Sequence, residues 1–252
     1  MVGRNGWRKN MVRRKILIGT PICESKNYCW SEYTKAISQL IIPAGMEIVH
    51  FVVDTTNTPS KQIEDKCIEA NIDYTWVSSL KAMDKVVMAR NEIFQYAKNI
   101  KADYVLFIDS DVIVPPNTIQ ELLTGLAQYN PYWGVITGFY PITTKIGFPT
   151  APAKLWTKIG YMDFPDNYLN GKIYEVDMTG LGLTLIPSKV FETFKFSCYR
   201  DKDGKLLASE DMVFFTQILN HRFCTQKLPV LFHTGLVAKH LIGGDFEWDD
   251  KA

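Results

Sequence analysis

Two aspartates, Asp109 and Asp111, stand one residue apart at the end of the apolar run YVLFI, residues 104–108. A run without polar alternation is typical of a strand that is covered on both faces. Two carboxylates that leave such a strand together repel each other in a shared cavity unless a cation lies between them. Carboxylate oxygens suit Mg²⁺ and Mn²⁺, ions that also hold the diphosphate of a nucleotide. The pair therefore indicates a metal site, and a simple loop cap is the alternative.

Other side chains can join such a site. Asp54 ends a second apolar run, and Arg90 would supply a fixed positive charge with a forked set of donors. Among the four histidines, His240 precedes Leu-Ile-Gly-Gly, a stretch suited to wrapping a ligand. A lone histidine is more often structural than ligating, so His240 and, as the runner-up, His233 are candidate metal ligands with a structural role as the alternative.

The elements that must position these residues alternate between strand and helix over the first half of the chain. Short apolar runs predict strands at 15–22, 46–57, 72–79 and 102–109. Apolar residues at helical spacing predict helices at 31–42 (with Ser31 as a cap), 61–71, 83–100 and 115–129. The alternation predicts an α/β fold with a mostly parallel sheet. In such sheets ligands bind outside the carboxyl ends of the strands, which is where Asp54, Asp109 and Asp111 fall.

The second half of the chain is less regular. We expect a strand at 133–141, a loop-rich segment at 143–156, strand and loop at 174–187, and an apolar loop between His233 and His240. Helices are predicted at 188–194 and 209–222, the latter with Ser209 as its cap. Because no clear linker divides the chain, one domain is predicted at 14–252, after a basic and flexible arm at 1–13.

Aromatic residues crowd the irregular middle of the chain. Aromatic faces can stack on sugar rings, and Tyr140 and Trp156 are the predicted sugar contacts. Core packing is the alternative explanation for both side chains.

Composition narrows the classes of partner. The 252 residues are 46% hydrophobic and 22% charged, and a net charge of +1 gives no general attraction to nucleic acid. The five cysteines form no CxxC pair, so neither a zinc ribbon nor a disulfide framework is indicated.

The basic start, MVGRNGWRKNMVRRK, is followed by an apolar run too short for a signal peptide, and no stretch approaches the ~20 apolar residues of a membrane span. We expect a cytoplasmic protein, with peripheral membrane contact through the basic arm as an alternative.

The segment VVMARNEIFQYAKNIKADYVLFIDSDVIVPP, residues 86–116, resembles the donor-binding core of GT-A glycosyltransferases, especially the inverting family 2-like group. In that group an ARN-type segment on a helix precedes a hydrophobic strand that ends in DxD. The matching residues here are Ala89-Arg90-Asn91 and Asp109-Ser110-Asp111. The resemblance implies that Arg90, Asn91, Asp109 and Ser110 contact the nucleotide sugar and that both aspartates bind the metal.

Two earlier landmarks resemble the family's nucleotide pocket. The first strand ends in Thr20-Pro21, and VVDTTN, residues 52–57, is similar to the strand whose terminal acid contacts the base, so Asp54 takes that place. VVDTTN lacks the second acid and the Gly-Ser of the commoner DDGS version, and the resemblance therefore leaves the nucleotide open. The nucleotide-binding half is predicted at 14–130.

Three later landmarks resemble the acceptor and catalytic half, predicted at 131–252. TGLGLTLIP, residues 179–187, is similar to the glycine-containing segment on the acceptor side, which implicates Gly180 and Gly182. ASEDMVFF resembles the family's ED motif, which implies Asp211 as the general base beside Glu210. Without that resemblance, the two acids would be read as serving the dipole of a helix start. VAKHLIG resembles the late histidine motif, which implies His240 as the metal ligand.

The resemblance implies an enzyme that uses Mn²⁺ or Mg²⁺ and a nucleoside-diphosphate sugar. The sugar would pass to a hydroxyl of a glycan, lipid or protein-linked acceptor with inversion at the anomeric carbon. A sugar-phosphate nucleotidyltransferase is one alternative, although TPICESKNYC, residues 20–29, lacks the glycines of its phosphate loop. An inactive carbohydrate-binding homologue is the other, and the retained acids count against it, since unpaired carboxylates in a cleft are unfavourable.

Overall fold

Four parallel strands form one half of the central sheet: β1 (Arg14–Ile22), β2 (Met46–Asp54), β3 (Asp73–Trp76) and β4 (Tyr104–Ile108). The computed structural model describes residues 13–79, 81–129, 132, 134–143, 149–150, 153–157, 160–163, 170–223 and 226–241. The four strands are linked by the 3-10 helix η1 (Glu24–Cys29) and the helices α1 (Trp30–Ser38), α2 (Lys61–Glu69) and α3 (Ala82–Asn99). Crossover helices of this kind join parallel strands, as the alternating pattern predicts.

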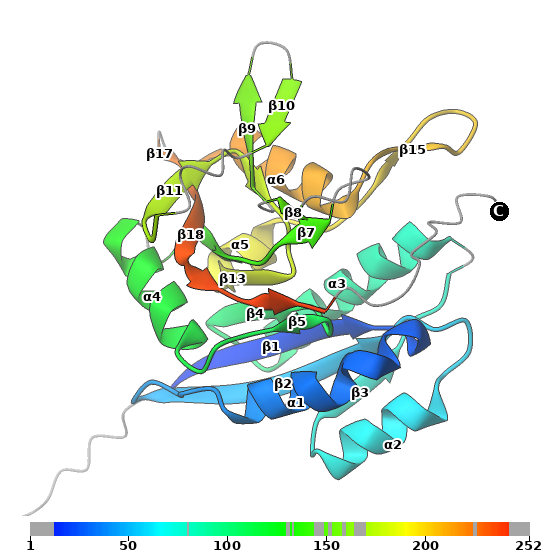
Figure 1. The fold of residues 1–252 in the computed structure, drawn as a ribbon. Coiled ribbons are helices and arrows are strands. Elements are labelled where there is room, and N and C mark those ends of the chain that lie inside the picture. The colour runs from blue at the N-terminus through cyan, green and yellow to red at the C-terminus, as the bar shows by residue number, and fades with distance from the viewer. Residues whose placement is uncertain are drawn as a thin grey trace, which may run out of the picture.

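The other half of the sheet comes from the later part of the chain. It contains β6 (Val135–Phe139), β11 (Ile173–Val176), β13 (Leu183–Pro187) and β18 (Val230–Val237), after the helix α4 (Thr118–Tyr129). The strand order is β11-β18-β6-β13-β4-β1-β2-β3. Four of the seven neighbouring pairs are parallel, which confirms an α/β fold with a mostly parallel sheet (Figure 1).

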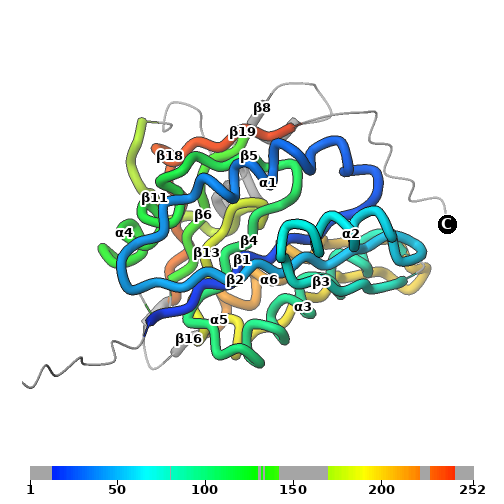
Figure 2. Tube along the Cα trace, turned by 90° about the horizontal axis from the view of Figure 1, so that it is seen from below, coloured from blue at the N-terminus to red at the C-terminus, as the bar shows by residue number. Residues whose placement is uncertain are grey.

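Helices cover both faces of this sheet because successive strand side chains point to opposite sides. In β1, Leu17 belongs to one core cluster while Ile16 and Ile18 belong to the other. The first cluster includes buried residues of α3, α5 (Ser188–Thr193) and α6 (Glu210–Asn220), and the second those of α1, α2 and α4. Figure 2 shows α1 on one side of β1 and β2, and α3 with α5 on the other.

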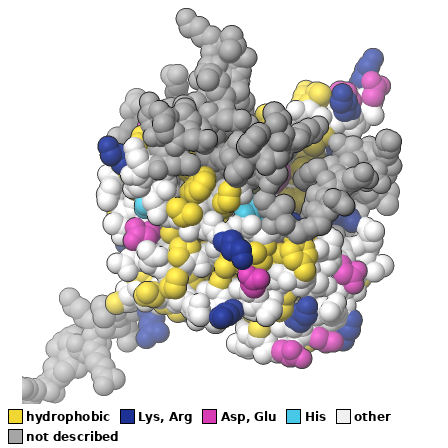
Figure 3. Space-filling view, viewed as in Figure 1, with side chains coloured by type: hydrophobic (Ala, Val, Ile, Leu, Met, Phe, Trp, Pro, Cys, Tyr) yellow, Lys and Arg dark blue, Asp and Glu magenta, His cyan; other side chains and the backbone are white. Residues whose placement is uncertain are grey.

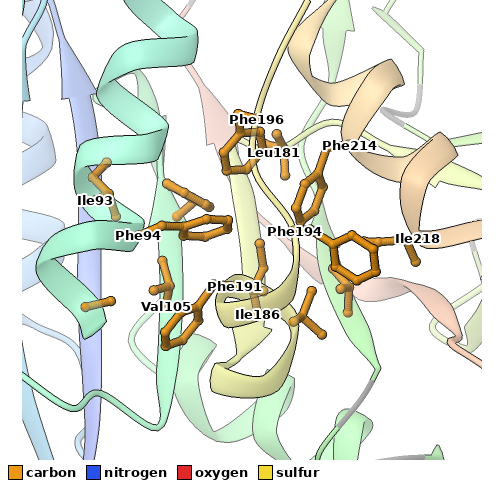
Figure 4. Close-up of a cluster of buried hydrophobic side chains, with 14 of the residues drawn as sticks. Ile93, Phe94, Val105, Leu181, Ile186, Phe191, Phe194, Phe196, Phe214 and Ile218 are labelled. Atoms are coloured by element: carbon orange, nitrogen blue, oxygen red, sulfur yellow. The ribbon is translucent and has the colours of Figure 1, made fainter. Parts of the chain in front are cut away.

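A group of phenylalanines fixes α3 and α6 against the sheet. Phe94 of α3 lies 5.6 Å from the ring of Phe191 and 4.8 Å from that of Phe196, between ring centroids (Figure 4). Phe196 in turn stacks on Phe214 of α6 at 4.4 Å. Buried aromatic pairs of this kind stabilise a fold beyond the area that they bury. The helix that carries Arg90 and the helix that begins with Glu210 are thereby held in fixed relative positions.

The remaining elements are short. They are β5 (Val112–Ile113), β7 (Ile142–Thr143), β8 (Pro149–Thr150), β9 (Ala153–Thr157), β10 (Gly160–Asp163), β12 (Met178–Thr179), β14 (Tyr199–Arg200), β15 (Leu206–Ala208), β16 (Arg222–Phe223), β17 (Gln226–Lys227) and β19 (Lys239–His240). All of these strands pair with one another in small sheets outside the central sheet.

The structure corrects three expectations about the elements. The helix predicted at 31–42 begins at Trp30 after Cys29, so Ser31 lies inside the helix and is not its cap. The loop-rich segment at 143–156 contains the short strands β8 and β9. The apolar loop expected between His233 and His240 belongs largely to β18, a strand of the central sheet, where long-range pairing with β6 outweighs the local turn signals.

None of the helices that the structure describes combines the length and apolar character that crossing a bilayer requires. On the face in Figure 3, lysine and arginine side chains lie among acidic and apolar ones. This mixture agrees with the net charge of +1. The predicted basic arm lies outside the described residues, except for Arg13.

Candidate active site

The centre of the site is the turn that follows β4. Asp109 and Asp111 lie in this turn, and the chain then pairs as β5 with β19, which sets His240 opposite Val112. The backbone N–H of Leu241 donates to the carbonyl of Asp111 at 2.7 Å. Backbone pairing therefore brings the late histidine segment to the aspartate pair, across more than a hundred residues of sequence.

Asp111 is the buried acid of the pair, with 7% of its surface exposed. Its Oδ2 lies 3.3 Å from Nε2 of His240 and 2.5 Å from Nζ of Lys26 in η1. Burial favours the protonated acid, but the hydrogen bonds from His240 and Lys26 outweigh burial and lower the pKa of Asp111. Asp111 is therefore held as a carboxylate.

The orientation of His240 is fixed by its other ring nitrogen. Nδ1 lies 2.8 Å from the carbonyl oxygen of Pro141, and since a carbonyl only accepts, Nδ1 carries the proton. The hydrogen bond from Nε2 to Asp111 therefore requires the protonated ring, a form that burial opposes and that Asp111 favours by raising the pKa of His240. Loss of the Nε2 proton would free a lone pair for a metal. A histidine whose Nδ1–H donates to a backbone carbonyl is arranged as metal-binding histidines are.

Asp109 faces a different partner, Arg90 of α3. The Nη2 atom of Arg90 lies 3.3 Å from Oδ1 of Asp109, and Nε lies 3.3 Å from Oε1 of Glu210 at the start of α6. The guanidinium is buried, with its Cζ 5.0 Å from the ring centroid of Phe107. Arg90 therefore joins the aspartate pair to the two acids of α6, which resemble the ED motif.

The acids around Arg90 have perturbed proton affinities. Burial raises the pKa of Asp109, Arg90 lowers it, and Asp111 raises it again, with a net increase. Burial likewise raises the pKa of Glu210, an effect that Arg90 opposes and Asp211 supports. Without the arginine, both groups would favour their neutral forms.

Asp211 lies in the first turn of α6, beside the buried Glu210. Its Oδ1 accepts hydrogen bonds from the backbone N–H of Met212, at 2.7 Å, and from the hydroxyl of Ser209. Ser209 occupies the cap position as predicted, but its hydroxyl binds Asp211 instead of the helix backbone. Asp211 is thereby oriented, with Oδ2 as its second oxygen.

Tyr140 and Gly182 close the site behind Asp109. The hydroxyl of Tyr140 accepts a hydrogen bond from the backbone N–H of Gly182 at 2.9 Å, and its ring packs edge-on against His240. A Cβ at residue 182 would lie 3.0 Å from the Tyr140 ring and 3.1 Å from Oδ2 of Asp109. Glycine permits this close approach. Gly180 lies in the same loop, where its carbonyl accepts from the hydroxyl of Thr184.

The comparisons with known proteins agree with this geometry. Residues 83–183, which contain Arg90 and the aspartate pair, match the family model described as glycosyl transferase family 2. GalNAc-T7, solved with UDP, GalNAc and Mn²⁺, has a TM-score of 0.61 at 11% identity over 92% of this chain. TarS 1-349 of S. aureus, solved with UDP-GlcNAc, has a TM-score of 0.60 at 12% identity over 95% of this chain. The fold is that of the GT-A glycosyltransferases.

The family match and the shared fold confirm the predicted resemblance to GT-A glycosyltransferases. The chain spans 44% of the GalNAc-T7 chain and 61% of the TarS 1-349 chain. No curated protein sequence matches this chain.

Two residues predicted to line the nucleotide pocket, Asp54 and Asn91, form hydrogen bonds within the protein itself. Asp54 is fully buried, and its carboxylate accepts from the backbone N–H groups of Thr56 and Ser60 and from the hydroxyl of Tyr74. The amide of Asn91 makes two hydrogen bonds with the backbone of Phe196. Both side chains thus order the loops around the GT-A site, and their contact with a nucleotide stays a prediction.

Thr20, at the carboxyl end of β1, belongs to a buried polar cluster. Its hydroxyl bonds to that of Tyr33, which lies 2.9 Å from Nε2 of His50. Pro21 follows in the same strand, and Ser110 is buried in the turn between the two aspartates. The nucleotide contacts of Thr20, Pro21 and Ser110 also remain predictions.

His50 makes this GT-A fold sensitive to acid. Burial lowers the pKa of His50 from 6.5 to about 4, so the unfolded chain takes up a proton before the folded chain does. Stability is therefore fully present above pH 6.5 and falls by up to roughly 3 kcal/mol as the pH drops toward 4. Replacing His50 with glutamine, which keeps an acceptor for Tyr33, should flatten that decline in urea unfolding midpoints. His221→Gln is the control, and a decline as steep in H50Q as in the wild type would contradict the assignment.

The structure places the two histidines that were predicted as candidate metal ligands in different surroundings. His233 lies in β18, with Nδ1 accepting from the N–H groups of Gly235 and Leu236 and Nε2 3.5 Å from Glu121 of α4. Only His240 of the pair therefore contacts the aspartates. The side chain of Trp156 lies outside the described residues, and Tyr140, at 5% exposure, is packed into the site wall.

Sequence reasoning missed Lys26. The signal was present, because Lys26 lies in the loop after the first strand, at the carboxyl edge where GT-A folds bind their ligands. Among the described residues, no group of three His, Cys, Asp or Glu side chains is arranged to hold a metal ion.

Proposed function

We propose that this chain is a metal-dependent, inverting glycosyltransferase that moves a sugar from a nucleoside-diphosphate sugar to an acceptor hydroxyl. The observation that supports it best is Arg90, which contacts Asp109 of the DxD turn and Glu210 of the ED motif in one buried arrangement. A donor site and a general base must lie this close together if a bound sugar is to be attacked.

The residues around Asp111 fit a divalent ion in their chemistry. Asp109 and Asp111 supply hard oxygen ligands, and His240 presents Nε2 because Nδ1 is committed to Pro141. Asp109, Asp111 and His240 would hold Mn²⁺ or Mg²⁺. When bound, such an ion offsets the charge of the departing nucleoside diphosphate. GalNAc-T7, which shares the fold, was solved with UDP and Mn²⁺.

The chain's own groups would perform the rest of the reaction. Asp211, oriented by Ser209 and the backbone of Met212, takes the proton from the acceptor hydroxyl. The hydroxyl oxygen attacks the anomeric carbon from the face opposite the diphosphate, which inverts that carbon. Arg90 holds Asp109 and Glu210 in place through its two buried ion pairs.

A screen of nucleotide sugars tests this function directly. With Mn²⁺, we expect one of them to release its nucleoside diphosphate, and excess EDTA should lower that rate at least ~100-fold because charge stabilisation by a metal is worth several kcal/mol. Restoring Mn²⁺ should restore the rate. Undiminished release in EDTA would exclude the metal dependence, and release from no donor would count against glycosyl transfer.

Lys26 gives a second candidate some support, since a nucleotidyltransferase needs a lysine after its first strand. The loop TPICESKNYC contains no glycine to bring backbone N–H groups around a phosphate. Including nucleoside triphosphates with sugar 1-phosphates in the same screen separates the two reactions, because only a nucleotidyltransferase releases diphosphate from the triphosphate.

A further inference from the structure

Lys26 is held at the aspartate pair by the structure of η1. The helix is tied to α2 through Asn27, which contacts Gln62 and Lys66. It is also tied to the segment after β19, because the hydroxyl of Tyr28 donates to the carbonyl of Leu241 at 3.0 Å. With its backbone anchored on both sides, the 18% exposed side chain of Lys26 is directed at Asp111.

Two groups meet at one oxygen of Asp111. Nζ of Lys26 lies 2.5 Å from Oδ2, and Nε2 of His240 lies 3.3 Å from the same atom. A divalent ion bound by Oδ2 would lie about 2.0–2.6 Å from it, and so within roughly 5 Å of the ammonium. Like charges that close repel strongly at a partly buried site. The ion and the ammonium therefore exclude each other at Oδ2.

The ammonium keeps its charge at this position. Its Nζ forms an ion pair with the carboxylate of Asp111, and the ammonium is the ordinary form of a lysine side chain. When an ion displaces it, Lys26 needs another anion within reach of its four-carbon stem. The diphosphate that the ion carries is such an anion, and a flexible ammonium suits phosphate oxygens.

We propose that Lys26 alternates between Asp111 and the donor diphosphate, so that the divalent ion and the nucleotide bind cooperatively. This role rests on the proposed function. Lys26 weakens the binding of the ion when no nucleotide is present. When the ion binds together with the diphosphate, Lys26 contacts the phosphate and stabilises the bound ion. By linkage, the nucleotide must strengthen ion binding by the same factor as the ion strengthens nucleotide binding.

Mn²⁺ titrations followed by the EPR signal of the free ion test the proposal without any turnover. In Lys26→Met we expect Mn²⁺ alone to bind at least ~10-fold more tightly, because the competing charge is gone. At saturating Mn²⁺ we compare the affinities of K26M and the wild type for UDP and for GDP. For each nucleotide that the wild type binds, K26M should bind at least ~10-fold more weakly, since a charged phosphate contact is lost. Lys26→Arg should behave like the wild type.

Lys66→Met is the matched control. Lys66 lies in α2 and contacts Asn27 of the 3-10 helix that carries Lys26, with Nζ 3.3 Å from Oδ1 of Asn27. We expect this variant to bind Mn²⁺ and nucleotide within about twofold of the wild type, as for a surface lysine.

The outcomes distinguish the two proposals. Equal Mn²⁺ affinity in K26M and K66M would overturn the role of Lys26, and nucleotide binding by the wild type would leave the proposed function standing. A wild type that binds Mn²⁺ but neither UDP nor GDP would count against the proposed function instead. In that case the Mn²⁺ titrations of K26M and K66M still decide whether Lys26 and the ion compete.

Discussion

Asp211→Asn is expected to lower the rate of sugar transfer at least ~10³-fold, within the range that general-base catalysis contributes. The amide keeps the size of the carboxylate and can still accept from Met212 and Ser209, so the start of α6 should be preserved. What it loses is the ability to take a proton. Affinity for UDP or GDP with Mn²⁺ should therefore stay within about twofold of the wild type, a difference that calorimetry resolves.

Two variants control for indirect effects. Ser209→Ala removes the hydroxyl that binds Asp211 but keeps the carboxylate, so we expect a smaller loss of rate, about tenfold or less, as for one hydrogen bond. Asp201→Asn removes an acid from the turn between β14 and β15 and should leave the rate unchanged. Wild-type turnover in D211N would exclude Asp211 as the base, and a parallel loss of nucleotide affinity would point to a role in the binding site.

Arg90→Met should lower the free energy of unfolding by about 3–5 kcal/mol, the usual effect of removing one member of a buried ion pair. The guanidinium is 5% exposed and holds both Asp109 and Glu210, so its removal leaves two carboxylates without their cation. The contact with the Phe107 ring is lost as well. Urea unfolding with constant m-values measures the difference.

The pH dependence of that loss provides an internal check. Burial raises the pKa of Asp109 and Glu210, and Arg90 is the group that opposes the increase at both. Without Arg90, the folded-state pKa values rise further above those of the unfolded chain. Protonation then favours the folded state at low pH, and stability is lost as the pH rises through the folded-state values. The deficit of R90M should therefore be larger at pH 8 than at pH 5.

Arg200→Met is the matched control, because Arg200 pairs with Asp84 in a more exposed position, at 22% exposure of the arginine side chain. It should change stability by about 1 kcal/mol or less. If R90M is as stable as R200M, the buried ion pairs of Arg90 do not hold α3, β4 and α6 together as the distances indicate.

The sequence was sufficient to predict those features that depend on residues close to one another along the chain. The run YVLFI followed by Asp109 predicted a buried strand with acids at its exposed end, and the structure has both. Ser209 before Glu210 likewise marked the start of α6. These features depend on neighbours in the sequence, which a single chain displays directly.

Pairings across the chain could not be predicted in this way. Asp54 and Asn91 look like ligand-binding residues in sequence, but their oxygens and amide are used by the backbone of nearby loops. Lys26 gave no comparable pattern, because its significance depends on the distance of its ammonium from Asp111. Choosing His240 over His233 required knowing that β19 pairs with β5.

That late pairing has a consequence for how the protein is made on the ribosome. Arg90, both aspartates and Glu210 emerge well before β18, which must still insert between β11 and β6, and before β19 reaches β5. A nascent chain that ends near residue 223 thus has most of its acidic groups but neither His240 nor a complete sheet. Contacts between distant segments form late and slowly. The proposed site would therefore be complete only after nearly all of the described chain has been synthesised.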